Sequence, residues 1–269
     1  MINVSELIKD SYNILRKEKL IWIIAFVIGL VSLIPDLLPA QNLLIRDKNI
    51  EFFLLNLLVI FVSLYLVVMM FTVISMAIQR KLKNKSMILK QTNHFFWRYL
   101  GLSVLIGIAV MVLMMITALI LTLLMIMIIS VSGAGSLTIN DYSSILVYWL
   151  VIFPVVVIPM FLLLYLKFSL AIPIMFLDDR KAIDSLKDSY SKSKGHVVDI
   201  LLIGMILLII AVVGLVPVMG VELLILKGYQ PNIVITVLSS VFSVVTLPVF
   251  MTFAQIFYFN GCLAIKKIK

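Results

Sequence analysis

The sequence predicts an all-α fold: a polytopic membrane helix bundle with six transmembrane helices and amphipathic interfacial helices on the cytoplasmic side. Hydrophobic residues make up 63% and charged residues 13% of the 269 residues, whereas soluble domains contain about 45–50% apolar and about 25% charged residues. Six apolar segments are long enough to cross a hydrocarbon core of about 30 Å as helices. The basic residues gather in alternate connections, as they do in multi-pass membrane proteins.

Each predicted span is an apolar segment with few charges and the length that a membrane helix needs, about 20 residues. The spans cover residues 20–38, 52–79, 99–130, 145–176, 197–226 and 233–264. At about 1.5 Å per residue the longest exceed the membrane core, so we expect them to tilt or kink. The connections are too short for an independent domain, so residues 1–269 are predicted to form a single integral membrane domain.

Lysine and arginine predict the orientation. Of the 22 basic residues, 18 lie in the N-terminal segment, the second and fourth connections and the C-terminal tail, whereas the opposite side has Arg46, Lys48 and Lys227. Because basic segments stay on the cytoplasmic side, both termini are predicted to be cytoplasmic in a multi-pass protein of the cell (plasma) membrane. The expected contacts of this charge are membrane lipids, anionic on the cytoplasmic side, and not nucleic acid.

Three cytoplasmic segments have the periodicity of helices that lie at a membrane surface. Lys9-Asp10-Ser11-Tyr12 in the first recurs as Lys187-Asp188-Ser189-Tyr190 in the third. The second, beginning near Met87, is predicted as a separate helix ending at Phe95-Phe96-Trp97-Arg98. We therefore predict three units, each an interfacial helix followed by a helical hairpin. The candidate interfacial residues are Ser11, Tyr12, Trp97, Arg98, Ser189 and Tyr190.

The third interfacial helix has further predicted details. Ile183, Leu186 and Tyr190 are expected to share its apolar face. Asp178 or Asp179 is expected to cap its start, an interpretation favoured over a divalent-ion site because a hard cation prefers several converging oxygens.

Motifs of enzyme chemistry are missing from the sequence. It has no phosphate-binding loop, no zinc-protease helix motif and no nucleophile elbow. His94 and His196 lie in different basic connections, and no partner for acid–base catalysis is suggested for either. The single cysteine, Cys262, excludes an intramolecular disulfide. We therefore expect no catalytic residue, no metal and no cofactor.

Polar side chains and prolines inside the predicted spans are the remaining candidates. The amides are Asn56, Gln255 and Asn260, for which hydrogen bonding between helices is favoured over a substrate path. Prolines remove a backbone donor and favour kinks. The candidate kink positions are Pro154, Pro159, Pro173, Pro217 and Pro248.

Short landmarks along the chain resemble a known family. They are Ser11-Tyr12 before Leu15-Arg16-Lys17, Ala171-Ile172-Pro173, Ala182-Ile183 with Ser189 and Lys194-Gly195, and Thr246-Leu247-Pro248 before Ala254 and Tyr258. In this order they resemble six-span prokaryotic membrane proteins related to the glycerophosphodiester phosphodiesterase membrane domain and to YciC-like proteins. The resemblance implies the six-span fold. In the phosphodiesterase relatives catalysis belongs to a separate soluble domain, so no catalytic residue is carried over.

Two functional hypotheses follow. The leading one is a non-catalytic membrane protein that acts as a scaffold, an anchor or an envelope-associated component through its basic inner surface. The alternative is a transporter or permease for a small or lipid-like solute, which requires a polar pocket that includes Gln255 or Asn56.

Overall fold

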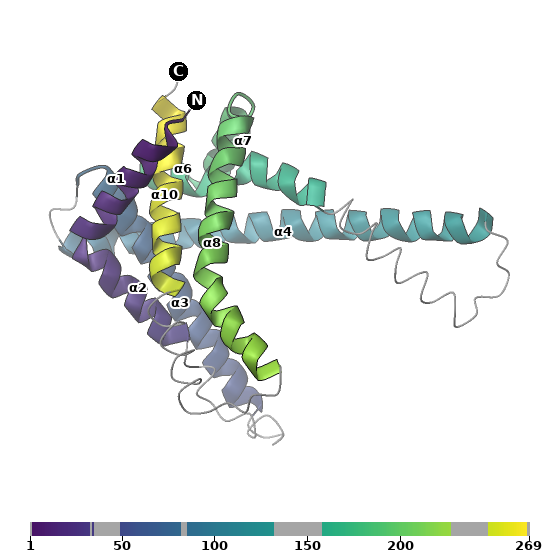
Figure 1. The fold of residues 1–269 in the computed structure, drawn as a ribbon, viewed down its shortest axis with the longest axis horizontal. Helices are drawn as coiled ribbons and strands as arrows, with labels where there is room; N and C mark the ends of the chain where they lie inside the picture. The colour runs from purple at the N-terminus through teal and green to yellow at the C-terminus, as the bar shows by residue number, and fades with distance from the viewer. Residues whose placement is uncertain are drawn as a thin grey trace.

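The computed structural model describes residues 2–32, 34, 49–81, 85–131, 158–226 and 247–267, and these are helical with no strand among them (Figure 1). The helices are α1 (Val4–Lys17), α2 (Lys19–Ser32), α3 (Asn49–Ile78), α4 (Lys85–Val131), α6 (Ala171–Asp178), α7 (Ala182–Ser193), α8 (Val197–Leu226) and α10 (Leu247–Lys267). A further helical segment, 158–168, directly precedes α6. The prediction of an all-α fold is confirmed for this part of the chain.

Five of the described helices are long and apolar enough to cross a membrane. They are Phe53–Ile78, Ser86–Ile120, Ile158–Asp178, Val197–Val216 and Pro248–Lys266, and they correspond to the second to sixth predicted spans. The first predicted span, 20–38, contains the 14-residue helix α2, about 21 Å long against a core of about 30 Å. Most of its remaining residues lie outside the described ranges. The chain is thus a multi-pass membrane protein, and its described residues contain five candidate spans.

An aromatic core joins four helices in the packed half of the bundle. It consists of Phe71 of α3, Phe95 of α4, Phe176 of α6 and Phe259 of α10, all buried. The centroid of the Phe176 ring lies 5.4 Å from that of Phe71, 4.8 Å from that of Phe95 and 6.1 Å from that of Phe259. Their tilted and edge-to-face arrangements are those that ring quadrupoles favour.

The two ends of the described chain meet at one end of the bundle (Figure 1). Ile2 and Leu7 belong to the same buried cluster as Cys262 and Ile265 of α10. The backbone turns at Glu18 between α1 and α2, and the Trp22 indole donates to the Leu15 carbonyl across this turn at 2.7 Å. The turn lets α1 pack against α10.

The three predicted units pack in a similar way. The interfacial helix of each unit contacts the last helix of the hairpin of another unit. Thus α1 contacts α10, the first part of α4 contacts α3, and α7 contacts α6. Each of these first helices contains a hydroxyl side chain with no exposed surface, namely Ser11, Thr92 or Ser189. A lysine lies two residues before each hydroxyl. This arrangement is what three repeats of one unit would produce.

The second predicted interfacial helix does not end before the membrane span, so that prediction is wrong. α4 runs without interruption from Lys85 to Val131, 47 residues, because no proline lies in it and each of its two glycines, Gly101 and Gly107, costs a helix only about 1 kcal/mol. The helix is about 70 Å long. Figure 1 shows it extending well beyond the other helices, and only 6% of the residues in the apolar 18-residue stretch that defines its candidate span are buried.

The fourth predicted span is interrupted. In its described part a first helix ends at residue 168, and α6 begins at Ala171. Pro173 lies four residues after Ser169 and has no N–H to donate to the Ser169 carbonyl, which explains why the helix breaks here.

Candidate functional site

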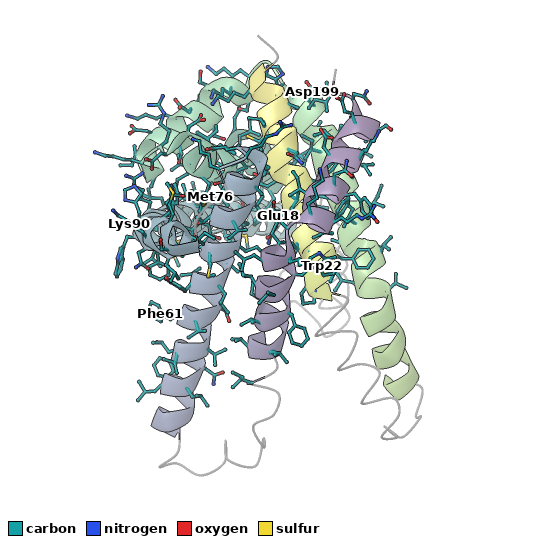
Figure 2. The ribbon with its side chains drawn as sticks, turned by 90° about the vertical axis from the view of Figure 1, so that its left-hand side faces the viewer. Glu18, Trp22, Phe61, Met76, Lys90 and Asp199 are labelled. Atoms are coloured by element: carbon teal, nitrogen blue, oxygen red, sulfur yellow. The ribbon has the colours of Figure 1, made fainter. Side chains whose placement is uncertain are left out.

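Polar side chains from distant parts of the chain gather at the end of the bundle where the termini meet. Figure 2 shows Asp199 at this end and Phe61 of α3 toward the other. The backbone N–H of Ile2 donates to Asp199 Oδ1 at 3.3 Å, and His196 Nδ1 lies 3.3 Å from Asp199 Oδ2. Lys266 of α10 forms an ion pair with Asp178 of α6. We call this region the polar end.

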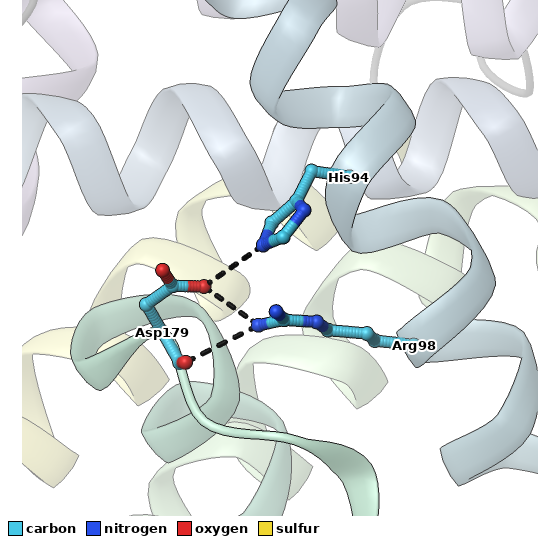
Figure 3. A network of polar contacts seen from close by, with 3 residues as sticks. All are labelled: His94, Arg98 and Asp179. Carbon is cyan, nitrogen blue, oxygen red and sulfur yellow. Dashed lines mark hydrogen bonds and ion pairs between the residues drawn. The ribbon is translucent and has the colours of Figure 1, made fainter.

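Asp179 is the centre of one network at the polar end (Figure 3). Its Oδ1 accepts a hydrogen bond from Arg98 Nη1 at 2.7 Å and lies 3.2 Å from His94 Nε2. Arg98 also donates to the Asp179 carbonyl at 3.2 Å. His94 and Arg98 are four residues apart in α4 and therefore share one helix face. The network ties α4 to the turn between α6 and α7.

The prediction that Asp178 or Asp179 caps α7 is wrong. The N-cap is Lys181, which makes no side-chain capping hydrogen bond. Asp179 instead ends α6 in the left-handed region, at φ 53°, which aspartate tolerates better than most residues. Both carboxylates are turned toward basic groups of other helices, and these charge-assisted contacts replace the cap.

Both histidines have a carboxylate neighbour that sequence reasoning did not suggest. Asp179 is 85 positions from His94, so helical periodicity could not pair them. Asp199 lies only three residues after His196, and this spacing is the signal that could have indicated the second pair. Asp179 and His94 are 66% and 49% exposed, respectively, so water screens the pair. Among the described residues, no group of three or more His, Cys, Asp or Glu could hold a metal ion.

The three residues of the apolar face predicted for α7 differ in burial: Leu186 packs against the buried cluster that contains the aromatic core, whereas Ile183 and Tyr190 are exposed. The buried residues of α7 are Ser185, Ser189 and Ser193. Small side chains allow α7 to approach its neighbours closely, and Ser189 Oγ donates to the Lys167 carbonyl at 2.7 Å. The four-residue spacing of the serines was the pattern that could have indicated this face.

The exposed ring of Tyr190 lies between two lysines. Lys167 Nζ is 4.8 Å and Lys194 Nζ 5.1 Å from its centroid, within the range of cation–π attraction. Of the other predicted interfacial residues, Tyr12 and Trp97 are exposed as well. Tyr190 therefore holds Lys167, the one charge in the fourth predicted span, at the surface.

Asn260 forms the interhelical hydrogen bond that its sequence position predicted. Its Nδ2 donates to Ser11 Oγ at 3.0 Å, and Ser11 Oγ donates to the Leu7 carbonyl at 2.7 Å. Ser11 is fully buried and Asn260 is 9% exposed. This contact joins α1 to α10.

The Ser11→Ala variant is expected to lose about 1–3 kcal/mol of unfolding free energy, because the Asn260 amide is left buried without an acceptor. In the Ser11→Ala background, Asn260→Ala should lower the unfolding free energy by less than it does in the unmodified chain. A double-mutant cycle in detergent micelles measures this coupling. The exposed Ser191 provides a control, since Ser191→Ala should change stability little. Strict additivity of Ser11→Ala and Asn260→Ala would contradict the contact.

The other candidate positions are not brought together. Asn56 is half-buried in α3, and Gln255 Oε1 in α10 is buried without a hydrogen-bond partner. The prolines lie apart: Pro159 is in the first turn of 158–168, Pro173 is buried in α6, Pro217 lies within continuous α8, Pro248 is in the first turn of α10, and Pro154 lies outside the described residues.

A charged groove of about 960 Å³ opens between α1, the end of α3 and α10. We define the charged groove by its charged lining residues, Asp10, Lys17, Glu18 and Arg80; Asn13 and Asn260 also line it. Charges of both signs face this groove, which can therefore bind a partner with mixed charge.

Comparison of the chain with family models, with curated proteins and with solved structures finds no match. Its function is therefore inferred from its own residues and their geometry.

Proposed function

We propose that this chain is a non-catalytic membrane protein that serves as a scaffold or anchor at the cytoplasmic face of the cell membrane. The observation that carries the proposal is the cross-bracing of the polar end. Contacts between residues separated by 81 to 249 positions tie together α1, α4, α6, α8 and α10. A braced surface suits the binding of a partner, because little conformational entropy is lost when the complex forms.

The assignment of the polar end to the cytoplasm rests on the distribution of lysine and arginine. Exposed basic residues, among them Lys9 and Lys187, lie on helices at this end. Each contributes about 1 kcal/mol of attraction when it is close to an anionic leaflet. In this proposal lipid charge holds the surface at the membrane, and the charged groove faces a protein partner.

The resemblance to the glycerophosphodiester phosphodiesterase membrane domain and to YciC-like proteins is part of the proposal. It implies six spans, with residues 20–38 as the first, and places no catalytic residue in this chain.

The transporter alternative requires a polar pocket that includes Gln255 or Asn56. Neither residue lines the charged groove, and neither lines the apolar groove of about 420 Å³ between α4, the helix 158–168, α8 and α10. The aromatic core, moreover, fills the space between α3, α4, α6 and α10. These observations favour the scaffold.

Photo-crosslinking in cells tests the scaffold role. A benzophenone amino acid at Asn13, which lines the charged groove, is expected to form a discrete adduct with a protein. The same probe at Phe61, 47% exposed on α3, should give lipid adducts. Combining Lys17→Glu with Arg80→Glu should abolish the protein adduct, because both charges line the charged groove.

The matched control is Lys187→Glu, which changes an exposed charge of α7 at the same end but outside the groove. It should leave the adduct unchanged. The proposal fails if Asn13 crosslinks only to lipid, or if the protein adduct is insensitive to reversal of the groove charges.

A further inference from the structure

Two residues just after membrane helices share a backbone conformation that side chains rarely adopt. Arg80 lies just after α3, the last helix of the first predicted hairpin, and Asp179 just after α6, the last helix of the second. Among the described residues other than glycine, these two have a positive φ, 56° and 53°. The left-handed conformation brings the Cβ too close to the backbone, so it is uncommon outside glycine. Its recurrence at the same place in two units makes Arg80 the counterpart of Asp179.

The first part of α4 holds Asp179 with two side chains. His94 and Arg98 follow the fully buried Thr92 by two and six residues, so they are four residues apart and share one helix face. Arg98 Nη1 donates to Asp179 Oδ1 at 2.7 Å, and His94 Nε2 lies 3.2 Å from the same oxygen (Figure 3). In the second unit, side chains at these two steps from the buried hydroxyl therefore bind a carboxylate.

The first unit brings the corresponding residues to the charged groove. In α1, steps of two and six residues from the fully buried Ser11 lead to Asn13 and Lys17. Both line the charged groove together with Arg80. An amide thus corresponds to the imidazole of the second unit, a lysine to its arginine, and an arginine to its aspartate. The first unit has two cations and an amide around the groove, and it has a base at the position where the second unit has its acid.

Arginine is an unfavourable residue for the backbone at position 80. The Arg80 N–H donates to the Ala77 carbonyl at 3.0 Å, and the Lys81 N–H donates to the Met76 carbonyl at 2.9 Å. These are the two hydrogen bonds of a Schellman helix end, in which the left-handed residue is usually glycine. Within the described part of the chain, Arg80 forms no ion pair that offsets this strain. Strained residues of this kind occur where a side chain serves binding.

We propose that Lys17 and Arg80 bind a carboxylate of a protein partner, as the second unit binds its own Asp179. This inference rests on the proposed scaffold function and names the group that the charged groove recognises. Lys17, like Arg80, makes no ion pair among the described residues. An ammonium and a guanidinium donate charge-assisted hydrogen bonds to a carboxylate, and these are about twice as strong as hydrogen bonds between neutral groups.

The acids of the charged groove determine what lies beside the bound carboxylate. Asp10 and Glu18 line the groove with the two cations, so two acidic and two basic residues give it no net charge. The acids repel an anionic lipid headgroup or a purely acidic segment, whereas they attract basic residues next to the bound acid. The turn after α6 has this composition, an aspartate followed by Arg180 and Lys181. The partner segment that fits is therefore one acidic residue adjacent to basic residues.

A zero-length crosslinker tests the inference. A carbodiimide joins a carboxylate to an amine in direct contact, and it is applied to membranes from cells that produce the full chain. Lys17 is expected to form an amide bond with an aspartate or glutamate of another polypeptide, which mass spectrometry of the purified adduct identifies. Lys187, exposed on α7 and outside the charged groove, should form no bond with that polypeptide. Bonds from Lys17 to the neighbouring Glu18 remain within one chain and are recognised by their mass.

Two variants of Lys17 separate its charge from its amine. Lys17→Arg keeps the charge, so a benzophenone amino acid at Asn13 should still form its protein adduct, whereas the carbodiimide bond is lost. Lys17→Gln removes both the charge and the amine. It should weaken the benzophenone adduct about tenfold, because a hydrogen bond to a charged group is lost.

Arg80→Asp gives the first unit the acid that the second unit has. In the purified chain, in uncharged detergent at low ionic strength, it should unfold about 1–3 °C above Arg80→Asn, because the carboxylate then pairs with Lys17. Asparagine is the matched control, since it has the same size and is also enriched at positive φ. In a Lys17→Gln background the two variants should unfold at the same temperature.

The possible failures are distinguishable. If the benzophenone probe at Asn13 forms a protein adduct but Lys17 forms no bond with a carboxylate of that protein, acid recognition is wrong and the scaffold function stands. If the probe at Asn13 crosslinks only to lipid, both proposals are wrong. Equal unfolding temperatures of Arg80→Asp and Arg80→Asn would contradict the correspondence between Arg80 and Asp179. If Arg80→Asp does not fold, the carbodiimide result for the unmodified chain decides.

Discussion

Phe176→Ala is expected to lower the unfolding free energy by about 3–5 kcal/mol, the cost of removing a large buried aromatic side chain. Phe176 is 2% exposed and its ring contacts those of Phe71, Phe95 and Phe259. Its removal leaves a cavity where α3, α4, α6 and α10 meet. Reversible unfolding by sodium dodecyl sulfate in mixed micelles measures the loss.

Phe53→Ala is the matched control for size and chemistry. Phe53 lies in a candidate span of α3 and is 64% exposed, so its ring contacts lipid or detergent, which is as apolar as the protein interior. Its removal should cost less than about 1 kcal/mol. Equal losses for the two variants would mean that the aromatic core does not hold the four helices together.

Gly261→Ala is expected to destabilise the packing of α10 against α8 by about 1–3 kcal/mol. A Cβ at Gly261 would lie 2.6 Å from Cδ1 and 3.2 Å from Cγ1 of Ile203. Ile203 is 3% exposed within the cluster that also contains Phe257 and Cys262, so it has little space to move. The same unfolding titration measures the effect.

Gly107→Ala separates this steric effect from helix propensity. Both glycines lie inside helices, but a Cβ at Gly107 meets nothing within 4 Å. Alanine there should be neutral or stabilise by up to about 1 kcal/mol, the difference in helix propensity. If Gly261→Ala behaves in the same way, α8 and α10 do not approach each other as closely as in this structure.

The membrane helices were predictable because their evidence is local. The fifth span was predicted at 197–226, and α8 runs from Val197 to Leu226. The second was predicted at 52–79, close to the candidate span Phe53–Ile78. A run of apolar residues is sufficient for these predictions, since hydrocarbon forces the backbone to satisfy its own hydrogen bonds. The count of six was less secure, because α2 has only 14 residues.

The wrong predictions concern short polar segments that could adopt more than one local structure or pair with more than one partner. The segment before span three was predicted as a separate helix, but nothing between Lys85 and Tyr99 stops a helix, and α4 continues through it. The aspartates before α7 were predicted as caps, but Arg98 and Lys266 compete for them from other helices. The local sequence pattern does not include these basic residues, because they come close to the aspartates only after the chain has folded.

Thr92 shows how a repeated feature can escape sequence comparison. Lys90-Gln91-Thr92-Asn93 shares with the two Lys-Asp-Ser-Tyr segments only a lysine and a hydroxyl at the right spacing. In the structure Thr92 is as fully buried as Ser11 and Ser189. The constraint at this position is a small hydroxyl side chain between helices, and serine or threonine can meet it.

By itself the sequence determined that this protein is helical and multi-pass, because composition and the length of apolar runs depend on neighbouring residues alone. Only the tertiary structure decided which surfaces face each other. It joined Ser11 to Asn260, paired Asp179 with Arg98, and left the hydroxyl groups of Tyr165 and Ser169 buried without hydrogen-bond partners. Membrane helices are apolar on most sides, so their sequence does not show which side faces another helix. Side-chain volume and a few polar contacts determine which faces pack together, and both depend on the whole bundle.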